Sequence, residues 1–342
     1  MMTKTIALWE QDEYEFPYAG AFVPNITAYL HADEQMRPAM IVVPGGGYAM
    51  VSPTEGEIVA KKFYQAGYQA FVLTYTTNMF RLKALEKQPL KDISRAVRHI
   101  RKFAHELKIK DGLVACCGFS AGAHVVGSLA VHYRDGDLED APFRQTSNRP
   151  DAVILCYPVI TAGEKAHRES FQLLLGPEPS KEQLTWASLE KQVTSDTPPA
   201  FLWHTLTDET VPVENSTLFV KACRENHVPC ELHLFMSGEH GMSLADEDWA
   251  SDNLGENSHY TMMQQWQTVK TMYEHDPAAL PDIYTASARA QTLPEFMAEW
   301  SKATAGFRRQ TQHKADASIS QWPVLALAWL DKVLKRPCDG FC

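Results

Sequence analysis

The most chemically suggestive stretch of the sequence is Gly118–Gly122, which reads Gly-Phe-Ser-Ala-Gly around Ser120. It follows an apolar run typical of a buried strand, Leu113–Cys117, and precedes a helical pattern, Ala123–His132. In that context a Gly-x-Ser-x-Gly motif predicts a sharp strand-to-helix turn that exposes the serine hydroxyl as a nucleophile. Small residues are needed two positions before and after the serine, because larger side chains would collide with the neighbouring strand and helix. The alternative is that Ser120 merely caps the helix.

A nucleophilic serine needs a general base and a group that orients the base. His240, one of 13 histidines, is the candidate base, because it lies in a glycine-flanked loop after the predicted strand Glu231–Phe235. Asp208 is the candidate acid, because it follows another predicted strand, Ala200–His204. His204 is the alternative base, and a solvated loop acid or helix cap is the alternative interpretation of Asp208. The chain order Ser, Asp, His is the order expected for a hydrolase with a nucleophile of this kind.

Hydrolysis through a serine also needs backbone N–H groups that bind the oxyanion. Three consecutive glycines, Gly45–Gly47, follow the apolar run Ala39–Val43 and allow N–H groups to turn inward without a side chain in the way. A second donor is expected at Ala121, directly after the nucleophile. The alternative is a phosphate-binding turn, but the spacing fits neither Gly-x-Gly-x-x-Gly nor a P-loop.

Apolar runs alternate with helical patterns along most of the chain. The predicted strands are Ala39–Val43, Gln69–Thr74, Leu113–Cys117, Ala152–Tyr157, Ala200–His204 and Glu231–Phe235. Most are continuously apolar, which is typical of strands covered on both faces of a parallel sheet. Amphipathic helical patterns, such as the one over residues 90–107, lie between them and indicate βαβ units. Ile26–Leu30 is expected to be an antiparallel addition near the N-terminus.

One stretch, Ser251–Ser318, contains no strand candidate. Its segments His259–His275 and Pro294–Thr304 have helical patterns rich in Met, Trp and Tyr, and a strong helix over Gln321–Lys335 follows. We interpret Ser251–Ser318 as a helical insertion, not an independent domain. Three roles remain open: a cap over the substrate pocket, a subunit interface, or plain helix core.

The composition sets outer limits on function. The 342 residues include 32 Lys+Arg and 42 Asp+Glu, so the net charge is −10, and 45% are hydrophobic. This balance is that of a globular protein and argues against non-specific binding to nucleic acid or anionic membranes. No apolar run is long enough to span a bilayer, and no signal peptide is recognisable, so a cytoplasmic location is expected. The seven cysteines are interpreted as reduced thiols, although Cys338 and Cys342 leave a metal or redox motif open.

Taken together, these motifs resemble those of α/β-hydrolases of the bacterial acetyl esterase/xylan esterase-like group, related to hormone-sensitive-lipase-type carboxylesterases. The matching stretches are Val42–Tyr48, Cys117–His124, Pro198–His204 leading to Asp208, and His240-Gly241 followed by Ser243–Asp246. There are two departures. Pro44 stands where many relatives have His before the glycines, and the insertion is longer than the connection expected between the histidine and the last helix.

The resemblance implies one α/β-hydrolase domain over residues 1–342, with a mostly parallel central sheet, helices on both faces, and the helical insertion 251–318 before the last helix. The implied site comprises the triad Ser120, Asp208 and His240 and the oxyanion donors Gly46, Gly47 and Ala121. It implies hydrolysis of short-chain, acetyl esters, acetylated sugars among them, with no metal or organic cofactor, and allows a homo-oligomer. Two rivals remain: an amide-directed hydrolase of the same fold, such as a peptidase or arylformamidase, and a non-catalytic binding protein.

Overall fold

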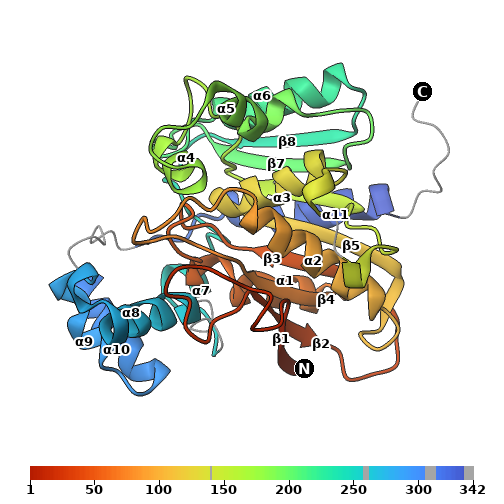
Figure 1. Cartoon of the computed structure of the whole chain (residues 1–342). Coiled ribbons are helices and arrows are strands. Elements are labelled where there is room, and N and C mark those ends of the chain that lie inside the picture. The colour runs from red at the N-terminus through yellow and green to blue at the C-terminus, as the bar shows by residue number, and fades with distance from the viewer. Residues whose placement is uncertain (139–140, 257–261, 305–312, 335–342) are drawn as a thin grey trace.

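The centre of the molecule is an eight-stranded sheet with the order β1-β2-β4-β3-β5-β6-β7-β8 (Figure 1). The computed structural model describes residues 1–138, 141–256, 262–304 and 313–334. The strands are β1 (Met2–Ala7), β2 (Asn25–Leu30), β3 (Arg37–Val43), β4 (Gln69–Thr74), β5 (Ile109–Phe119), β6 (Ala152–Cys156), β7 (Ala200–Thr205) and β8 (Cys230–Phe235). β2 is antiparallel to both of its neighbours, whereas β3 to β8 are all parallel.

Helices cover both faces of the sheet, which explains the continuous apolar runs. Every residue of β4, β6 and β7 is buried. The helices that flank the sheet are α1 (Glu57–Gln65), α2 (Gln88–Lys102), α3 (Ala121–His132), α6 (Glu214–Glu225) and α11 (Trp322–Leu334). One core cluster joins one face of the sheet to α2, α3 and α6, and a second joins the other face to α1 and α11. Successive strand residues alternate between the two clusters, as Ile41 and Val42 do. The predicted α/β architecture is therefore confirmed.

The described part of the insertion has an apolar core of its own. Its helices are α8 (Met263–His275), α9 (Thr285–Ala288) and α10 (Leu293–Thr304), which gather to one side of the sheet in Figure 1. Met272, Tyr284 and Trp300 are buried between them, so these large side chains are helix core, as one of the three interpretations expected. The start of the predicted helix, His259–Thr261, lies outside the described residues.

The insertion is anchored to the loops at one end of the sheet. The Gln264 side chain accepts hydrogen bonds from both the N–H and the hydroxyl of Thr77, at 2.8 and 2.9 Å. Met50, which follows the glycine loop, and Phe80 pack against the apolar core of the insertion. The insertion thus borders the segment that carries Gly45–Gly47, but its roles as cap or subunit interface stay predictions.

No helix within residues 1–138, 141–256, 262–304 and 313–334 is long and apolar enough to cross a bilayer. Cys338 and Cys342 lie outside the described residues.

Candidate active site

Ser120 occupies the turn between β5 and α3 in a strained conformation. Its φ and ψ angles are 51° and −119°, a region that residues with a side chain rarely adopt. A Cβ on Gly118 would lie 2.6 Å from the Cα of Ala123, and a Cβ on Gly122 would lie 2.2 Å from the carbonyl oxygen of Val43. The two glycines therefore let the helix approach β3 and the turn closely, as the motif predicted.

Substitution of Gly122 should destabilise the fold, because the backbone of β3 cannot move away from a new methyl group without breaking sheet pairing. We expect Gly122→Ala to lower the free energy of unfolding by about 2–4 kcal/mol, the range of severe steric changes in a core. Gly136→Ala is the matched control, since no atom lies within 4 Å of its Cβ position. Urea denaturation of the two variants measures the difference, and equal stabilities would contradict the proposed packing.

The structure brings the three predicted triad residues into one hydrogen-bonded chain. Ser120 Oγ lies 2.7 Å from His240 Nε2, and His240 Nδ1 lies 2.6 Å from Asp208 Oδ2. The three residues follow β5, β8 and β7, whose carboxyl ends meet at one edge of the sheet. Because Nδ1 carries the ring proton and donates a hydrogen bond to the carboxylate, Nε2 is unprotonated. It can therefore accept the proton of the serine hydroxyl.

The carboxylate of Asp208 is held as an anion by four hydrogen bonds. Oδ1 accepts the N–H groups of Thr210 and Val211, each at 2.9 Å, and Oδ2 accepts the ring N–H groups of His240 and His204. Burial alone would raise the pKa of Asp208, but the hydrogen bonds from His204 and His240 hold it well below its ordinary value. An ionised carboxylate at this position can orient and stabilise the imidazole of His240.

His204, the alternative base in the sequence, lies behind the acid and does not contact the nucleophile. Its side chain is completely buried, and Nε2 donates to Asp208 Oδ2 at 3.2 Å and to the Val211 carbonyl at 3.0 Å. Nδ1 lies 2.8 Å from the hydroxyl of Ser216, which can donate to it. His204 therefore holds the same carboxylate oxygen that bonds to His240, a role that the sequence did not predict.

The glycine loop passes directly beside the nucleophile. A Cβ on Gly45 would lie 2.8 Å from the Cβ of Ser120, and Gly46 and Gly47 have φ angles of 114° and 64°. Among the described residues, none accepts a hydrogen bond from the backbone N–H of Gly46, Gly47 or Ala121. The three predicted donors therefore remain able to bond to the oxygen of a ligand.

Glu55, a buried carboxyl group that no sequence motif marks, links this loop to the histidine loop. Glu55 is 3% exposed, and its two oxygens accept the N–H of Gly45 and the hydroxyl of Tyr157, both at 2.7 Å. The Tyr157 oxygen accepts the N–H of Ser243 at 3.0 Å, three residues after His240. Burial raises the pKa of Glu55, and the hydrogen bonds from Tyr157 and Gly45 oppose that shift. In the sequence, Glu55 has only the pattern of an acid near a helix start.

Two tyrosines support the glycine loop around Pro44. Tyr75 donates its hydroxyl to the carbonyl of Pro44 at 3.0 Å. Tyr48 donates to Nδ1 of His124 at 2.7 Å, and Nε2 of His124 donates to the Ala187 carbonyl at 2.9 Å. Burial lowers the pKa of His124 to about 4, so the ring is neutral and its Nδ1 atom can accept a hydrogen bond from the tyrosine hydroxyl. Pro44 therefore does not leave the loop unsupported.

Replacement of Glu55 by Gln should impair turnover more than substrate binding. The amide can accept only one of the two hydrogen bonds, so the glycine loop loses its fixed position relative to Ser120. We expect kcat to fall about 10- to 100-fold with KM nearly unchanged, because the loop acts on the transition state. Glu57→Gln is the control, since Glu57 is a buried neighbour that pairs with Lys61. Steady-state kinetics on p-nitrophenyl acetate distinguish the two, and equal kcat values would contradict the positioning role.

The same variant should alter the pH dependence of stability. Because the pKa of Glu55 is raised in the folded state, protonation of this carboxyl group adds to the free energy of unfolding. This contribution is complete below the pKa of a glutamate in the unfolded chain, about 4.3. Wild-type stability should therefore fall as pH rises from there through the raised pKa, and Glu55→Gln should lack this component. Urea denaturation from pH 4 to 8 would detect it. Parallel curves for wild type and variant would contradict the assignment.

The chain matches one protein family model, and it is similar to proteins named as a xylanase and as an esterase. Residues 27–223 match the BD-FAE family, a range that includes Ser120 and Asp208. The chain is 48% identical over 257 residues to endo-1,4-beta-xylanase B of Butyrivibrio fibrisolvens, covering 75% of this chain and 40% of the xylanase. It is 32% identical over 213 residues to an acetylxylan esterase of Xylanibacter ruminicola, covering 60% of this chain and 41% of that protein. The chain thus spans about two fifths of these curated relatives.

A solved structure matches over most of its length. The acetyl ester-xyloside bifunctional hydrolase of Caldicellulosiruptor lactoaceticus is 36% identical, with a TM-score of 0.66, and the match covers 81% of this chain and 97% of that one. The prediction of a carboxylic ester hydrolase is confirmed at the level of the family. The chain belongs to the BD-FAE family, within the acetyl esterase/xylan esterase-like α/β-hydrolases.

Proposed function

We propose that this chain is a serine carboxylesterase that removes short acyl groups, acetyl above all, from esters that include acetylated sugars. The observation that carries the proposal is the uninterrupted relay from Ser120 through His240 to Asp208, beside three backbone N–H groups that no described residue occupies. A nucleophile, a base, an orienting acid and an oxyanion site are the parts that acyl transfer requires.

In the first half of the reaction, Ser120 Oγ attacks the ester carbonyl carbon while His240 Nε2 takes the hydroxyl proton. The negative charge that develops on the carbonyl oxygen is met by the N–H groups of Gly46, Gly47 and Ala121. Asp208 stabilises the imidazolium without taking its proton. The carbon–oxygen bond to the alcohol then breaks, and His240 protonates the departing oxygen.

In the second half, water attacks the acyl-enzyme. His240 takes a proton from the water, and the same N–H groups hold the second oxyanion. Collapse of this intermediate breaks the bond to Ser120 Oγ, which recovers its proton from His240 and releases the carboxylic acid. No group beyond these side chains and N–H donors is needed for either half.

Two observations support a small acyl group on a sugar. Ser120 is only 6% exposed, which favours a short acyl group over a bulky one. Two of the similar proteins are named for action on acetyl esters, one as an acetylxylan esterase and one as an acetyl ester-xyloside hydrolase. The xylanase name belongs to a longer protein, of which this chain spans 40%.

A comparison of activity on four substrates tests the proposed function. We expect the wild-type protein to hydrolyse p-nitrophenyl acetate and to deacetylate acetylated xylotetraose, with much weaker activity on p-nitroacetanilide and no cleavage of unsubstituted xylotetraose. A larger kcat/KM on the anilide would favour the amide-directed rival. No turnover of any acyl substrate by a correctly folded protein would favour the non-catalytic rival.

A further inference from the structure

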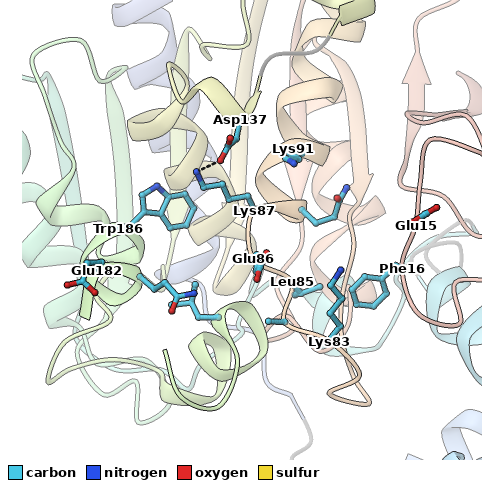
Figure 2. A pocket seen from close by; sticks show the side chains of 14 residues that line it. Glu15, Phe16, Lys83, Leu85, Glu86, Lys87, Lys91, Asp137, Glu182 and Trp186 are labelled. Carbon is cyan, nitrogen blue, oxygen red and sulfur yellow. Dashed lines mark hydrogen bonds and ion pairs between the residues drawn. The ribbon is translucent and has the colours of Figure 1, made fainter. Parts of the chain in front are cut away.

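A cavity of about 640 Å³, within the range of small-molecule sites, lies outside the triad. Its lining residues come from the start of α2 and the segment before it, the turn at Asp137, the end of α4 (Arg168–Leu175), α5 (Lys181–Ala187) and the N-terminal segment. Figure 2 shows Trp186 and Phe16 on opposite sides of it, with Leu85, Glu86 and Lys87 between them. None of the triad residues lines it.

The lining combines aromatic surface with hydrogen-bonding groups of both kinds. Trp186 is stacked on His132 with ring centroids 4.5 Å apart, which fixes the indole at the cavity wall. Lys87 Nζ lies 5.3 Å from the Trp186 ring centroid and is neutralised by Asp135 and Asp137, at 2.8 and 2.6 Å. His132 and Lys87 both lie against the indole, so the apolar face of a ligand would pack on the part of the ring that lines the cavity.

Several polar groups around the cavity still have hydrogen-bonding capacity. Gln183 uses its carbonyl oxygen on the N–H of Ser180, which leaves its NH₂ group, and Gln88 donates to Asp92, which leaves its carbonyl oxygen. Among the described residues, no hydrogen bond or ion pair occupies the ammonium groups of the two lining lysines Lys83 and Lys91 or the carboxylates of the two lining acids Glu15 and Glu86.

The charges around the cavity nearly cancel. Its lining contains three lysines (Lys83, Lys87, Lys91) and four acids (Glu15, Glu86, Asp137, Glu182). A phosphate or an acidic peptide would require an excess of cations, which is absent from this lining. An uncharged ligand with many hydroxyl groups uses donors and acceptors together and can lay a C–H face on an aromatic ring.

The cavity and the candidate triad border the two ends of the same helix. His167, directly before α4, has its Cε1 atom 3.9 Å from the Cβ position of Gly47 in the oxyanion loop. Leu175, the last residue of α4, lines the cavity. The N–H groups of Leu85 and Glu86 bond to carbonyls in the last turn of α4, at 3.2 and 2.6 Å. Eight helical residues span about 12 Å, so the two sites are separated by a distance that a chain-like ligand can bridge.

We propose that this cavity binds an uncharged oligosaccharide chain, in a subsite separate from the catalytic centre, with Trp186 as its stacking platform. This inference rests on the proposed function, since the bound chain would carry the acetyl ester cleaved at Ser120. The subsite then determines affinity for the sugar, whereas the triad determines the chemistry.

Calorimetric titration of the full chain with unacetylated xylotetraose tests the subsite directly. We expect Trp186→Leu to remove the stacking surface and Ala84→Arg to fill the cavity from a half-exposed lining position. Each should weaken xylotetraose binding by at least about tenfold relative to wild type. Val324→Ala, at a 62% exposed position on α11, is the matched control and should bind as wild type does. All three variants should keep wild-type kcat/KM on p-nitrophenyl acetate, which is too small to reach the cavity.

Two results would overturn the subsite: no measurable xylotetraose binding to the wild-type protein, or equal binding by Ala84→Arg and wild type. Ala84→Arg guards against misfolding of Trp186→Leu, because it removes no existing contact. Failure of the proposed function is distinguishable. If xylotetraose binds and Ala84→Arg blocks it, but acetylated xylotetraose is not deacetylated, the subsite is supported and the substrate proposal is contradicted.

Discussion

Ser120→Ala should abolish hydrolysis of p-nitrophenyl acetate while leaving the fold intact. Loss of the nucleophile of a serine triad reduces kcat on the order of 10⁶-fold, which leaves only the contribution of the oxyanion donors and binding. The Ser120 hydroxyl bonds to His240, whose side chain is 17% exposed and keeps its bond to Asp208, so we expect its removal to cost little stability. Kinetics and thermal denaturation of the same preparation would show lost activity at an unchanged melting temperature.

Ser128→Ala provides the control for this variant. Ser128 is buried in the same helix, α3, and its hydroxyl lies 3.4 Å from Nδ1 of His124, away from the relay. It should retain turnover close to that of the wild type. If Ser120→Ala kept appreciable activity, or if the two variants lost activity equally, Ser120 would not be the nucleophile.

Asp208→Asn should lower kcat about 10⁴-fold with little change in KM, the effect seen when the acid of a serine protease triad becomes an amide. An amide cannot accept hydrogen bonds at both positions, so His240 loses the partner that keeps the proton on Nδ1. The Nε2 atom then carries a proton and cannot accept one from Ser120. Substrate contacts are unaffected, so the loss falls on the transition state.

The control is Asp246→Asn, which changes an aspartate that caps α7 (Glu247–Ala250) and pairs with Lys62. It should affect stability slightly and kcat little. Near-normal kcat in Asp208→Asn would move the orienting role elsewhere. Asp208→Asn should also weaken the buried hydrogen bond between Asp208 and His204, so we expect this variant to be somewhat less stable. The kcat values must therefore be compared at a temperature below its melting temperature.

The strands could be predicted because burial on both faces produces continuous apolar runs, but their ends could not. β5 starts at Ile109 and not at the predicted Leu113, although Lys110 and Asp111 are exposed. Pairing of Ile109 with Arg37 in β3 extends the strand, and such pairing leaves no signal in a local pattern. The apolar periodicity over residues 90–107 likewise outlasts α2, which ends at Lys102.

Some residues of the site could likewise be predicted from the sequence, and others could not. Ser120 and the glycine loop have local motifs, and Asp208 and His240 follow strands in the expected order, so single segments identify them. No local motif identifies Glu55, because its hydrogen bond with Tyr157 joins two residues 102 positions apart in the chain. Tyr157 itself was predicted as the end of β6, but the strand ends at Cys156, and Tyr157 turns out with a φ of 36°. Only the folded chain shows that this turn directs its hydroxyl to Glu55.

In the proposed mechanism, one serine, activated by His240 and Asp208, forms the covalent acyl intermediate. Reaction of the wild-type protein with a fluorophosphonate, followed by proteolysis and mass spectrometry, tests this directly, because the reagent modifies only an activated nucleophile. We expect a single adduct on Ser120, formed in proportion to the loss of esterase activity and absent from Ser120→Ala. Inactivation with the adduct on another residue, or full esterase activity without any adduct, would contradict it.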